Sequence, residues 1–168
     1  MKRIVVVSTN NNPDYYFYAP YIEKAWNSYG WDLCIAVTSD VDVSTLKVNN
    51  QSTLIVRLPE VEGVRQESVA QAGRLYVAPY LIGYDLIITS DMDMLPLSNY
   101  WNPNIWDITV YGHDLTDYST FPMCYIAMNR KCWVDTMRLT NDIKADMERD
   151  SNEYAYMVKS SEWEQWWN

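Results

Sequence analysis

Residues 85–96 constrain this chain more than any other stretch of the sequence. A short apolar run ends at two aspartates one residue apart, Asp91 and Asp93, and Pro96 then stops the strand. Residues i and i+2 of an extended chain point the same way, so both carboxylates converge just beyond the carboxyl end of a buried strand. Open α/β sheets bind their ligands at that edge. Two adjacent carboxylates repel each other unless a cation lies between them, which predicts a hard divalent metal ion with phosphate oxygens.

Length and charge limit the kind of protein and the kind of partner. The 168 residues correspond to one domain, predicted to span residues 1–168, and 48% of them are hydrophobic, enough for a substantial core. The formal net charge of −9 argues against nucleic acid or an anionic membrane as the partner. A nucleotide bound through a metal ion remains compatible with that charge.

The sequence contains no apolar run long enough to span a bilayer and no signal-peptide pattern after Met1. The three cysteines, Cys34, Cys124 and Cys132, are odd in number and lie in apolar surroundings. Buried reduced thiols are the expected state, which together with the missing signal pattern predicts a cytoplasmic protein. The sequence makes no prediction of oligomeric state.

Hydrophobic periodicity predicts alternating strands and helices. Strands are expected at residues 4–7, 31–37, 54–58, 86–90, 107–111 and 124–128, and helices at 13–30, 64–81 and 130–149. Pro20 allows a late start or a kink in the first helix, and Gly30 is expected to end it. This order predicts an α/β domain with a mostly parallel central sheet flanked by helices.

The same order resembles the glycosyltransferases of the GT-A fold over roughly residues 4–135. Residues 74–81, Arg-Leu-Tyr-Val-Ala-Pro-Tyr-Leu, precede the Asp-x-Asp strand and resemble the corresponding helix of glycogenin-like transferases. Residues 121–128 and the overall size are similar to small glycosyltransferase domains of large algal DNA viruses. The resemblance implies a GT-A-type domain that transfers a sugar from a nucleotide-diphosphate sugar, with UDP as the expected nucleotide, to a carbohydrate acceptor.

The resemblance also implies a metal site and a donor site. Asp91 and Asp93 would bind Mn²⁺ or Mg²⁺, with Asp93 as the direct ligand and Asp91 near both the ribose and the metal ion. The first-strand loop would contact the nucleobase and ribose, unless it is only a polar turn capping the next helix. Two arginines would contact the diphosphate or the base, the alternative being solvated positions on a helix face. The residues expected to bind the nucleotide are Ser8, Thr9, Asn10, Arg65, Arg74 and Asp91.

The expected catalytic group is a carboxylate late in the chain. Inverting enzymes of this kind use such a group as general base, and Glu162, followed by Trp163, fits that pattern. Inversion is favoured because this acid is present and no clear nucleophile is. Alternative bases are Asp114, Asp150 and Glu164. The single histidine, His113, either contacts sugar hydroxyls or is structural.

Two other functions fit the same motif. Haloacid-dehalogenase-like phosphatases place an Asp-x-Asp at a strand end, with the first aspartate as nucleophile. Their motif normally lies on the first strand and is followed by Thr or Val where this chain has Leu95. A non-catalytic sugar- or metal-binding module is the second alternative. Slow hydrolysis of a nucleotide-sugar in the presence of Mn²⁺ would distinguish the transferase from both.

Overall fold

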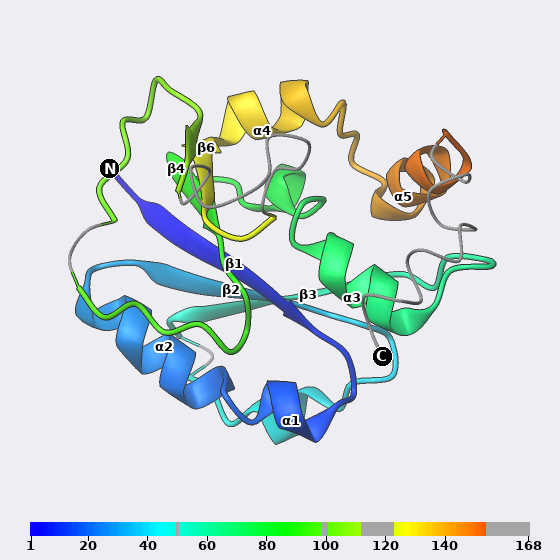
Figure 1. Cartoon of the computed structure of the whole chain (residues 1–168), viewed down its shortest axis with the longest axis horizontal. Helices are drawn as coiled ribbons and strands as arrows, with labels where there is room; N and C mark the ends of the chain where they lie inside the picture. The colour runs from blue at the N-terminus through cyan, green and yellow to red at the C-terminus, as the bar shows by residue number, and fades with distance from the viewer. Residues whose placement is uncertain (50, 99–100, 112–122, 154–168) are drawn as a thin grey trace.

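The fold is a six-stranded sheet with helices on both faces, seen in a computed structural model that describes residues 1–49, 51–98, 101–111 and 123–153. The strand order is β3-β2-β1-β4-β6-β5 (Figure 1). β1 to β4 are parallel, and β6 runs antiparallel to β4 and to β5. The predicted α/β class with a mostly parallel sheet is therefore confirmed. The strands are β1 Arg3–Thr9, β2 Asp32–Val37, β3 Thr53–Arg57, β4 Leu86–Thr89, β5 Thr109–Val110 and β6 Ile126–Asn129.

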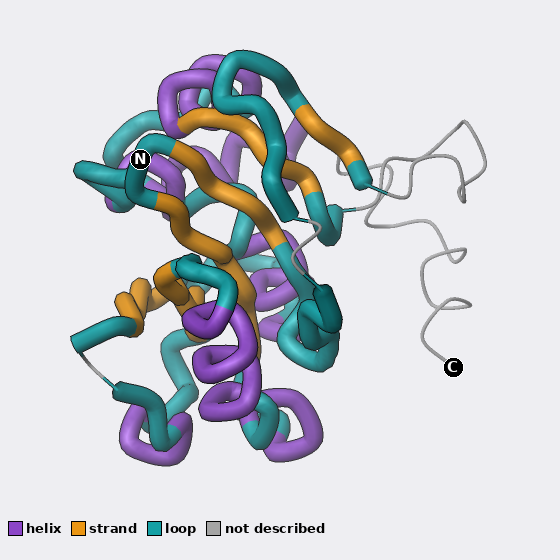
Figure 2. Tube along the Cα trace, turned by 90° about the vertical axis from the view of Figure 1, so that its left-hand side faces the viewer, coloured by secondary structure: helices purple, strands orange, loops and turns teal. Residues whose placement is uncertain are grey.

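The helices divide between the two faces of the sheet (Figure 2). Consecutive residues of a strand point to opposite faces, and both faces of β1 are buried, which explains its unbroken apolar run. α2 packs on one face, whereas α3, α4 and α5 pack on the other. The helical segments are α1 Pro13–Tyr16, α2 Ala19–Ser28, η1 Val43–Leu46, α3 Gln66–Gly73, η2 Ala78–Tyr80, α4 Arg130–Thr136 and α5 Ile143–Glu153.

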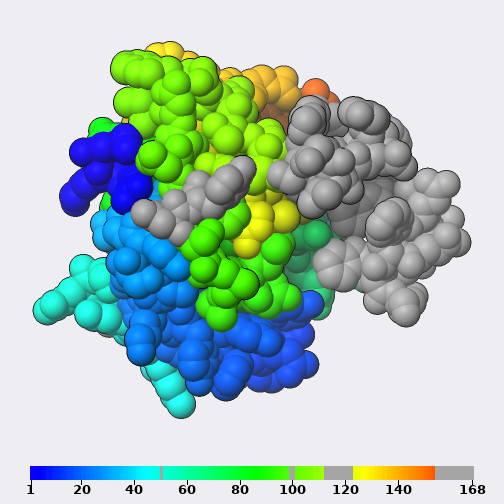
Figure 3. Space-filling view, turned by 60° about the vertical axis from the view of Figure 1, so that its left-hand side comes forward, coloured from blue at the N-terminus to red at the C-terminus, as the bar shows by residue number. Residues whose placement is uncertain are grey.

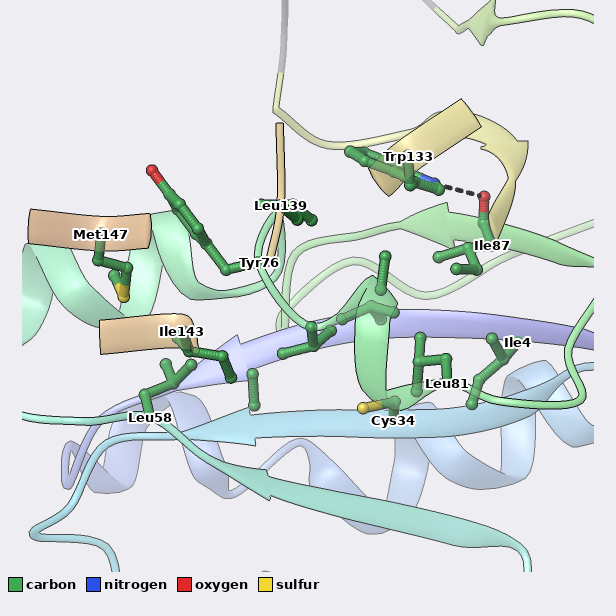
Figure 4. Close-up of a cluster of buried hydrophobic side chains, with 14 of the residues drawn as sticks. Ile4, Cys34, Leu58, Tyr76, Leu81, Ile87, Trp133, Leu139, Ile143 and Met147 are labelled. Atoms are coloured by element: carbon green, nitrogen blue, oxygen red, sulfur yellow. Dashed lines mark hydrogen bonds between the residues drawn. The ribbon is translucent and has the colours of Figure 1, made fainter. Parts of the chain in front are cut away.

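The core on the α3–α5 face joins the middle of the sheet to the last helices (Figure 4). Ile4 and Ile87 supply side chains from β1 and β4, and Met147 supplies one from α5. Trp133 of α4 is fully buried, and its indole Nε1 donates a hydrogen bond to the carbonyl of Ile87 at 3.3 Å. Burying a side chain of this size stabilises the fold by about 2–3 kcal/mol, so α4 is held against β4 by both packing and a polar contact.

The core on the α2 face holds the segment that carries the aspartate pair. Met92, the residue between the two aspartates, is 3% exposed and belongs to the same cluster as Trp26 of α2 and Ile88 of β4. In the space-filling view the chain after β4 lies against the region of α1 and α2 (Figure 3). Burial of Met92 therefore anchors the turn between Asp91 and Asp93.

The helix predicted over residues 64–81 is wrong in length, because α3 ends at Gly73 and only the short η2 follows. The amides of Leu75 and Tyr76 bond to carbonyls three residues back, which tightens the chain at the end of α3. Pro79 lies within η2, after this turn, and has no amide hydrogen to donate, so it disfavours one continuous helix through residue 81 but does not itself end α3.

The helix predicted over residues 130–149 is also wrong, since it consists of α4 and α5 with a turn between them. Arg138 adopts a φ of 52°, in the left-handed region that commonly follows a helix end. The side chain of Asp142 then accepts a hydrogen bond from the amide of Ala145 at 3.1 Å, which caps the start of α5. Thr140, Asn141 and Asp142 were the sequence signal for this break.

Several other predictions are confirmed. The first helical region breaks before Pro20 into α1 and α2, and Gly30 follows the end of α2 with a φ of 76°. Cys34, Cys124 and Cys132 are all free thiols, but only Cys34 is buried as predicted, whereas Cys124 and Cys132 are half-buried. β5 and β6 lie within or near the predicted ranges but differ at their ends. None of the helices in the described part of the chain is long and apolar enough to cross a membrane.

Candidate functional site

The topology creates a crevice at the carboxyl ends of β1 and β4. β2, the next strand in the chain after β1, lies on one side of β1 in the sheet. β4, which the chain reaches after β3, lies on the other side of β1. Ligands of open α/β sheets bind at such a switch point. The amide of Ser90 bonds to the carbonyl of Val6 at 2.9 Å, so the chain stays paired with β1 up to the residue before Asp91. The aspartate pair and the loop after β1 consequently meet.

A pocket of about 450 Å³ occupies this crevice, within the size range of small-molecule sites. It is formed by the loop after β1, the start of α1, one side of α3 and the turn after β4. Its lining residues are Ser8, Thr9, Asn10, Asn12, Tyr15, Glu67, Ala70, Gln71, Arg74, Asp91, Met92 and Asp93. Six of the residues expected from the sequence to bind nucleotide or metal, Ser8, Thr9, Asn10, Arg74, Asp91 and Asp93, are therefore brought together.

Arg74 is the only cation among the residues that line this pocket, and it is already paired. Its guanidinium Nη1 forms an ion pair with Asp91 and donates a hydrogen bond to the carbonyl of Ser90 at 2.7 Å. The Arg74 side chain is 6% exposed, whereas that of Asp91 is 33% exposed. Arg74 lies directly after α3, so the pair ties this helix to the end of β4. It is not the solvated helix-face arginine considered as the alternative above.

The two aspartates differ in their surroundings. Asp93 is exposed and lies in the turn after Met92, and its carboxylate forms no hydrogen bond or ion pair with any other residue that the structure describes. Asp91 has Arg74 as a partner and also lies close to the thiol of Cys124. Arg74 therefore neutralises the carboxylate of Asp91, whereas no described residue neutralises that of Asp93.

The loop after β1 combines a structural role with a place in the pocket. Thr9 is 2% exposed and donates from its hydroxyl to the carbonyl of Asn10 at 3.0 Å. The side chain of Asn12 caps α1 by accepting from the amide of Asp14 at 3.0 Å. Capping, the alternative considered above, thus holds for Asn12, while Ser8, Thr9 and Asn10 line the pocket as well.

The charges of the pocket fit a divalent cation. Its lining has three carboxylates, Glu67, Asp91 and Asp93, against the single guanidinium of Arg74. A diphosphate brought into such a site meets net negative charge, which a bound Mg²⁺ or Mn²⁺ would offset. No group of three or more histidine, cysteine, aspartate or glutamate side chains is arranged to hold a metal ion within the described part of the chain. The two aspartates would supply only part of the coordination, and such ions commonly take phosphate oxygens and water for the rest.

Other predicted residues lie away from this pocket. Arg65 is exposed at the N-cap of α3 and does not line it. Asp150 is bonded to Arg149 at 2.7 Å and to the hydroxyl of Tyr76 at 3.0 Å, so its carboxylate is occupied. Burial and the charge of Asp150 raise the pKa of Tyr76, so this phenol stays protonated. The candidates His113, Asp114, Glu162 and Glu164 and residues 121–122 lie outside the described residues.

Cys124 belongs to the segment that the resemblance associates with donor-sugar and acceptor contacts, but its position beside Asp91 and the role of Tyr125 were not predicted. Burial and the nearby charge of Asp91 raise the pKa of the Cys124 thiol. Tyr125 adopts a φ of 60°, a strained conformation for a bulky residue, and its ring packs on Trp101 with centroids 4.5 Å apart. β6 brings both residues next to β4, and no periodicity in the sequence signals that pairing. Glu67 and Gln71, which also line the pocket, were not predicted to bind a ligand.

No protein-family model matches this sequence, and no curated protein matches it significantly. Among solved structures, a galactosyltransferase LgtC in complex with donor and acceptor sugar analogs aligns with 85% of this chain and 68% of its own, at 10% identity and a TM-score of 0.47. An active-site mutant of LgtC aligns with 94% of this chain and 78% of its own, at 13% identity and a TM-score of 0.48.

Proposed function

We propose that this protein binds a nucleoside-diphosphate sugar through a divalent metal ion and transfers the sugar to a carbohydrate acceptor. The observation that carries the proposal is the meeting of Asp91, Asp93 and Arg74 in one pocket at the switch point of the sheet. A site with excess carboxylate charge suits a ligand that arrives as a metal complex, and a diphosphate is such a ligand. The pocket volume also suits a ligand of nucleotide size.

In this proposal, different residues of the pocket bind the metal ion, the diphosphate and the nucleoside. Asp93, together with the part of Asp91 that Arg74 does not engage, would hold Mn²⁺ or Mg²⁺. When bound, that ion supplies positive charge to the departing diphosphate. Arg74 fixes the orientation of Asp91 and adds a second positive charge at the same end of the pocket. Ser8, Thr9 and Asn10 offer hydroxyl and amide groups to the nucleoside.

The acceptor step rests on the sequence alone. We propose inversion, with Glu162 as the base that takes the proton of the acceptor hydroxyl while that oxygen attacks the anomeric carbon. The bond from that carbon to the diphosphate breaks in the same step, and the electron pair leaves with the nucleoside diphosphate. Asp150 is a poor alternative, because Arg149 and Tyr76 already occupy its carboxylate.

A binding screen followed by an activity assay tests this function. Thermal unfolding is measured with UDP, GDP, CMP and dTDP sugars, each with Mn²⁺ and with EDTA. A ligand that binds only the folded state raises the melting temperature, so a shift is expected with one nucleotide and Mn²⁺ together. Asp93→Asn should abolish the shift. Asp135→Asn is the matched control, since Asp135 pairs with Lys131 on the surface of α4.

The activity assay distinguishes the proposed transferase from a binding module and from a phosphatase. A transferase releases nucleoside diphosphate slowly from its donor without an acceptor, whereas a binding module shifts the melting temperature but releases nothing. A phosphatase would instead release phosphate and would leave nucleotide-sugars intact. Binding that is unchanged by EDTA and by Asp93→Asn would contradict the metal-bridged site.

A further inference from the structure

One side of α3 forms a row of polar side chains along the pocket. Glu67, Gln71 and Arg74 all line it, and their spacing of four and three residues places them on the same side of the helix. α3 packs against β1 (Figure 1), and Ser8 and Thr9 at the carboxyl end of β1 line the pocket. With a rise of 1.5 Å per residue, Glu67 lies about 10 Å along the helix axis from Arg74.

The two ends of this row face different parts of a nucleotide. Arg74 is paired with Asp91, so its end is the metal and phosphate end under the proposed function. A nucleoside extends from its phosphates through the ribose to the base. Under the proposed function, the base edge of a bound nucleotide would therefore lie at the far end of the row, at Glu67, and the ribose would lie near Gln71.

The carboxylate of Glu67 is available to bind a ligand in the pocket. Glu67 is exposed, and its carboxylate forms no ion pair or hydrogen bond with any other described residue. An ionised carboxylate only accepts hydrogen bonds, and it accepts two side by side in a bidentate arrangement.

This chemistry discriminates between nucleobases. Guanine presents a ring N–H and an exocyclic amine next to each other, which match the two oxygens of a carboxylate. Uracil presents one N–H flanked by two carbonyl oxygens, and these oxygens repel a carboxylate. Adenine and cytosine offer an exocyclic amine beside a ring nitrogen that is itself an acceptor, so neither matches both oxygens.

We infer that Glu67 selects a guanine nucleotide, so that the donor is a GDP-linked sugar. This inference rests on the proposed function and names its substrate class. It differs from the uridine nucleotide that the resemblance implies, because the carboxylate at the base end of this pocket is unfavourable for uracil.

The test compares Mn²⁺-dependent binding of GDP and UDP by calorimetry. Wild type should bind GDP about 10- to 100-fold more tightly than UDP, the range for hydrogen bonds to a charged group. Glu67→Gln should remove most of this preference, because a glutamine amide can donate to a uracil carbonyl. Glu62→Gln is the matched control, since Glu62 is exposed just before α3 and does not line the pocket.

The outcomes separate the two proposals. If neither diphosphate binds with Mn²⁺, the proposed function fails and the inference falls with it. If UDP binds at least as tightly as GDP, or if Glu67→Gln keeps the full preference, only the assignment of Glu67 is overturned. Thermal unfolding of each variant without ligand checks that α3 remains folded, and Glu67→Asp provides a second variant that keeps the charge at the first turn.

Discussion

Arg74 and Asp91 form an ion pair that joins the end of α3 to the end of β4, and a hydrogen bond of 2.7 Å from Arg74 to the carbonyl of Ser90 reinforces the connection. One carboxylate of the Asp-x-Asp motif is thus neutralised by the protein itself. Asp93 lacks such a partner among the described residues. The motif therefore consists of a positioned aspartate and a free one, and the two should respond differently to substitution.

Asp91→Asn should destabilise the fold, whereas Asp93→Asn should not. The first change leaves the buried guanidinium of Arg74 without its counter-charge, at a cost of about 1–3 kcal/mol. The second removes an exposed carboxylate that has no partner among the described residues, for which changes within about 0.5 kcal/mol are usual. Urea unfolding of both variants measures the difference. Equal stability of the two would show that the Arg74–Asp91 pair contributes little.

Arg74→Gln should change metal and nucleotide binding in opposite directions. Without the guanidinium, Asp91 and Asp93 attract a cation more strongly, so Mn²⁺ alone should bind more tightly. A nucleoside diphosphate should bind less tightly, by about 1–3 kcal/mol, because a charged donor is lost. Calorimetry with Mn²⁺ and with Mn²⁺ plus nucleotide measures both. Arg65→Gln is the control, since Arg65 is outside the pocket, and parallel losses in both titrations would indicate general unfolding.

Gly73→Ala should destabilise the protein by crowding the last turn of α3. A Cβ at this position would clash with the side chain of Leu58, which is itself buried. Overpacking of this kind costs about 1–3 kcal/mol. The double variant Gly73→Ala/Leu58→Ala should show less than the sum of the two single losses, because Leu58→Ala makes room. Additive losses in chemical denaturation would refute the close contact.

Alkaline pH should unfold this protein partly through Cys34. Burial raises the pKa of its thiol from 9.0 to about 12. The folded state therefore keeps a proton that the unfolded state loses above about pH 9, so stability falls between about pH 9 and 12, by up to about 1.4 kcal/mol per pH unit. Cys34→Ala should show a shallower fall over that window. An identical slope in the variant would mean that other groups cause the loss.

Glu162→Gln tests the catalytic base. The substitution keeps size and hydrogen bonding but removes the ability to accept a proton, so turnover with a competent acceptor should fall by about 10²–10⁴-fold. Binding of nucleoside diphosphate and Mn²⁺ should be unchanged. Near-normal turnover would shift the assignment to Asp114, and a product that retains the anomeric configuration of the donor would exclude the base role altogether.

Local sequence was sufficient for the strands and for the approximate position of the site. The apolar run before Asp91 predicted β4, because a parallel strand buried on both faces shows a continuous hydrophobic segment. Helix lengths were harder to predict. The apolar periodicity of residues 64–81 and 130–149 continues past the ends of α3 and α4, which are set by the turns at residues 74–76 and around Arg138.

The sequence by itself determined the α/β class and the presence of two carboxylates at a strand end, since both follow from residue type and spacing along one segment. Only the tertiary structure decided which residues surround those two carboxylates. The pairing of Arg74 with Asp91 joins residues 17 positions apart, and the approach of Cys124 and Tyr125 depends on antiparallel pairing of β6 with β4. Glu67 enters the pocket because α3 packs beside β1. These contacts arise from packing between distant segments, which no pattern within one segment records.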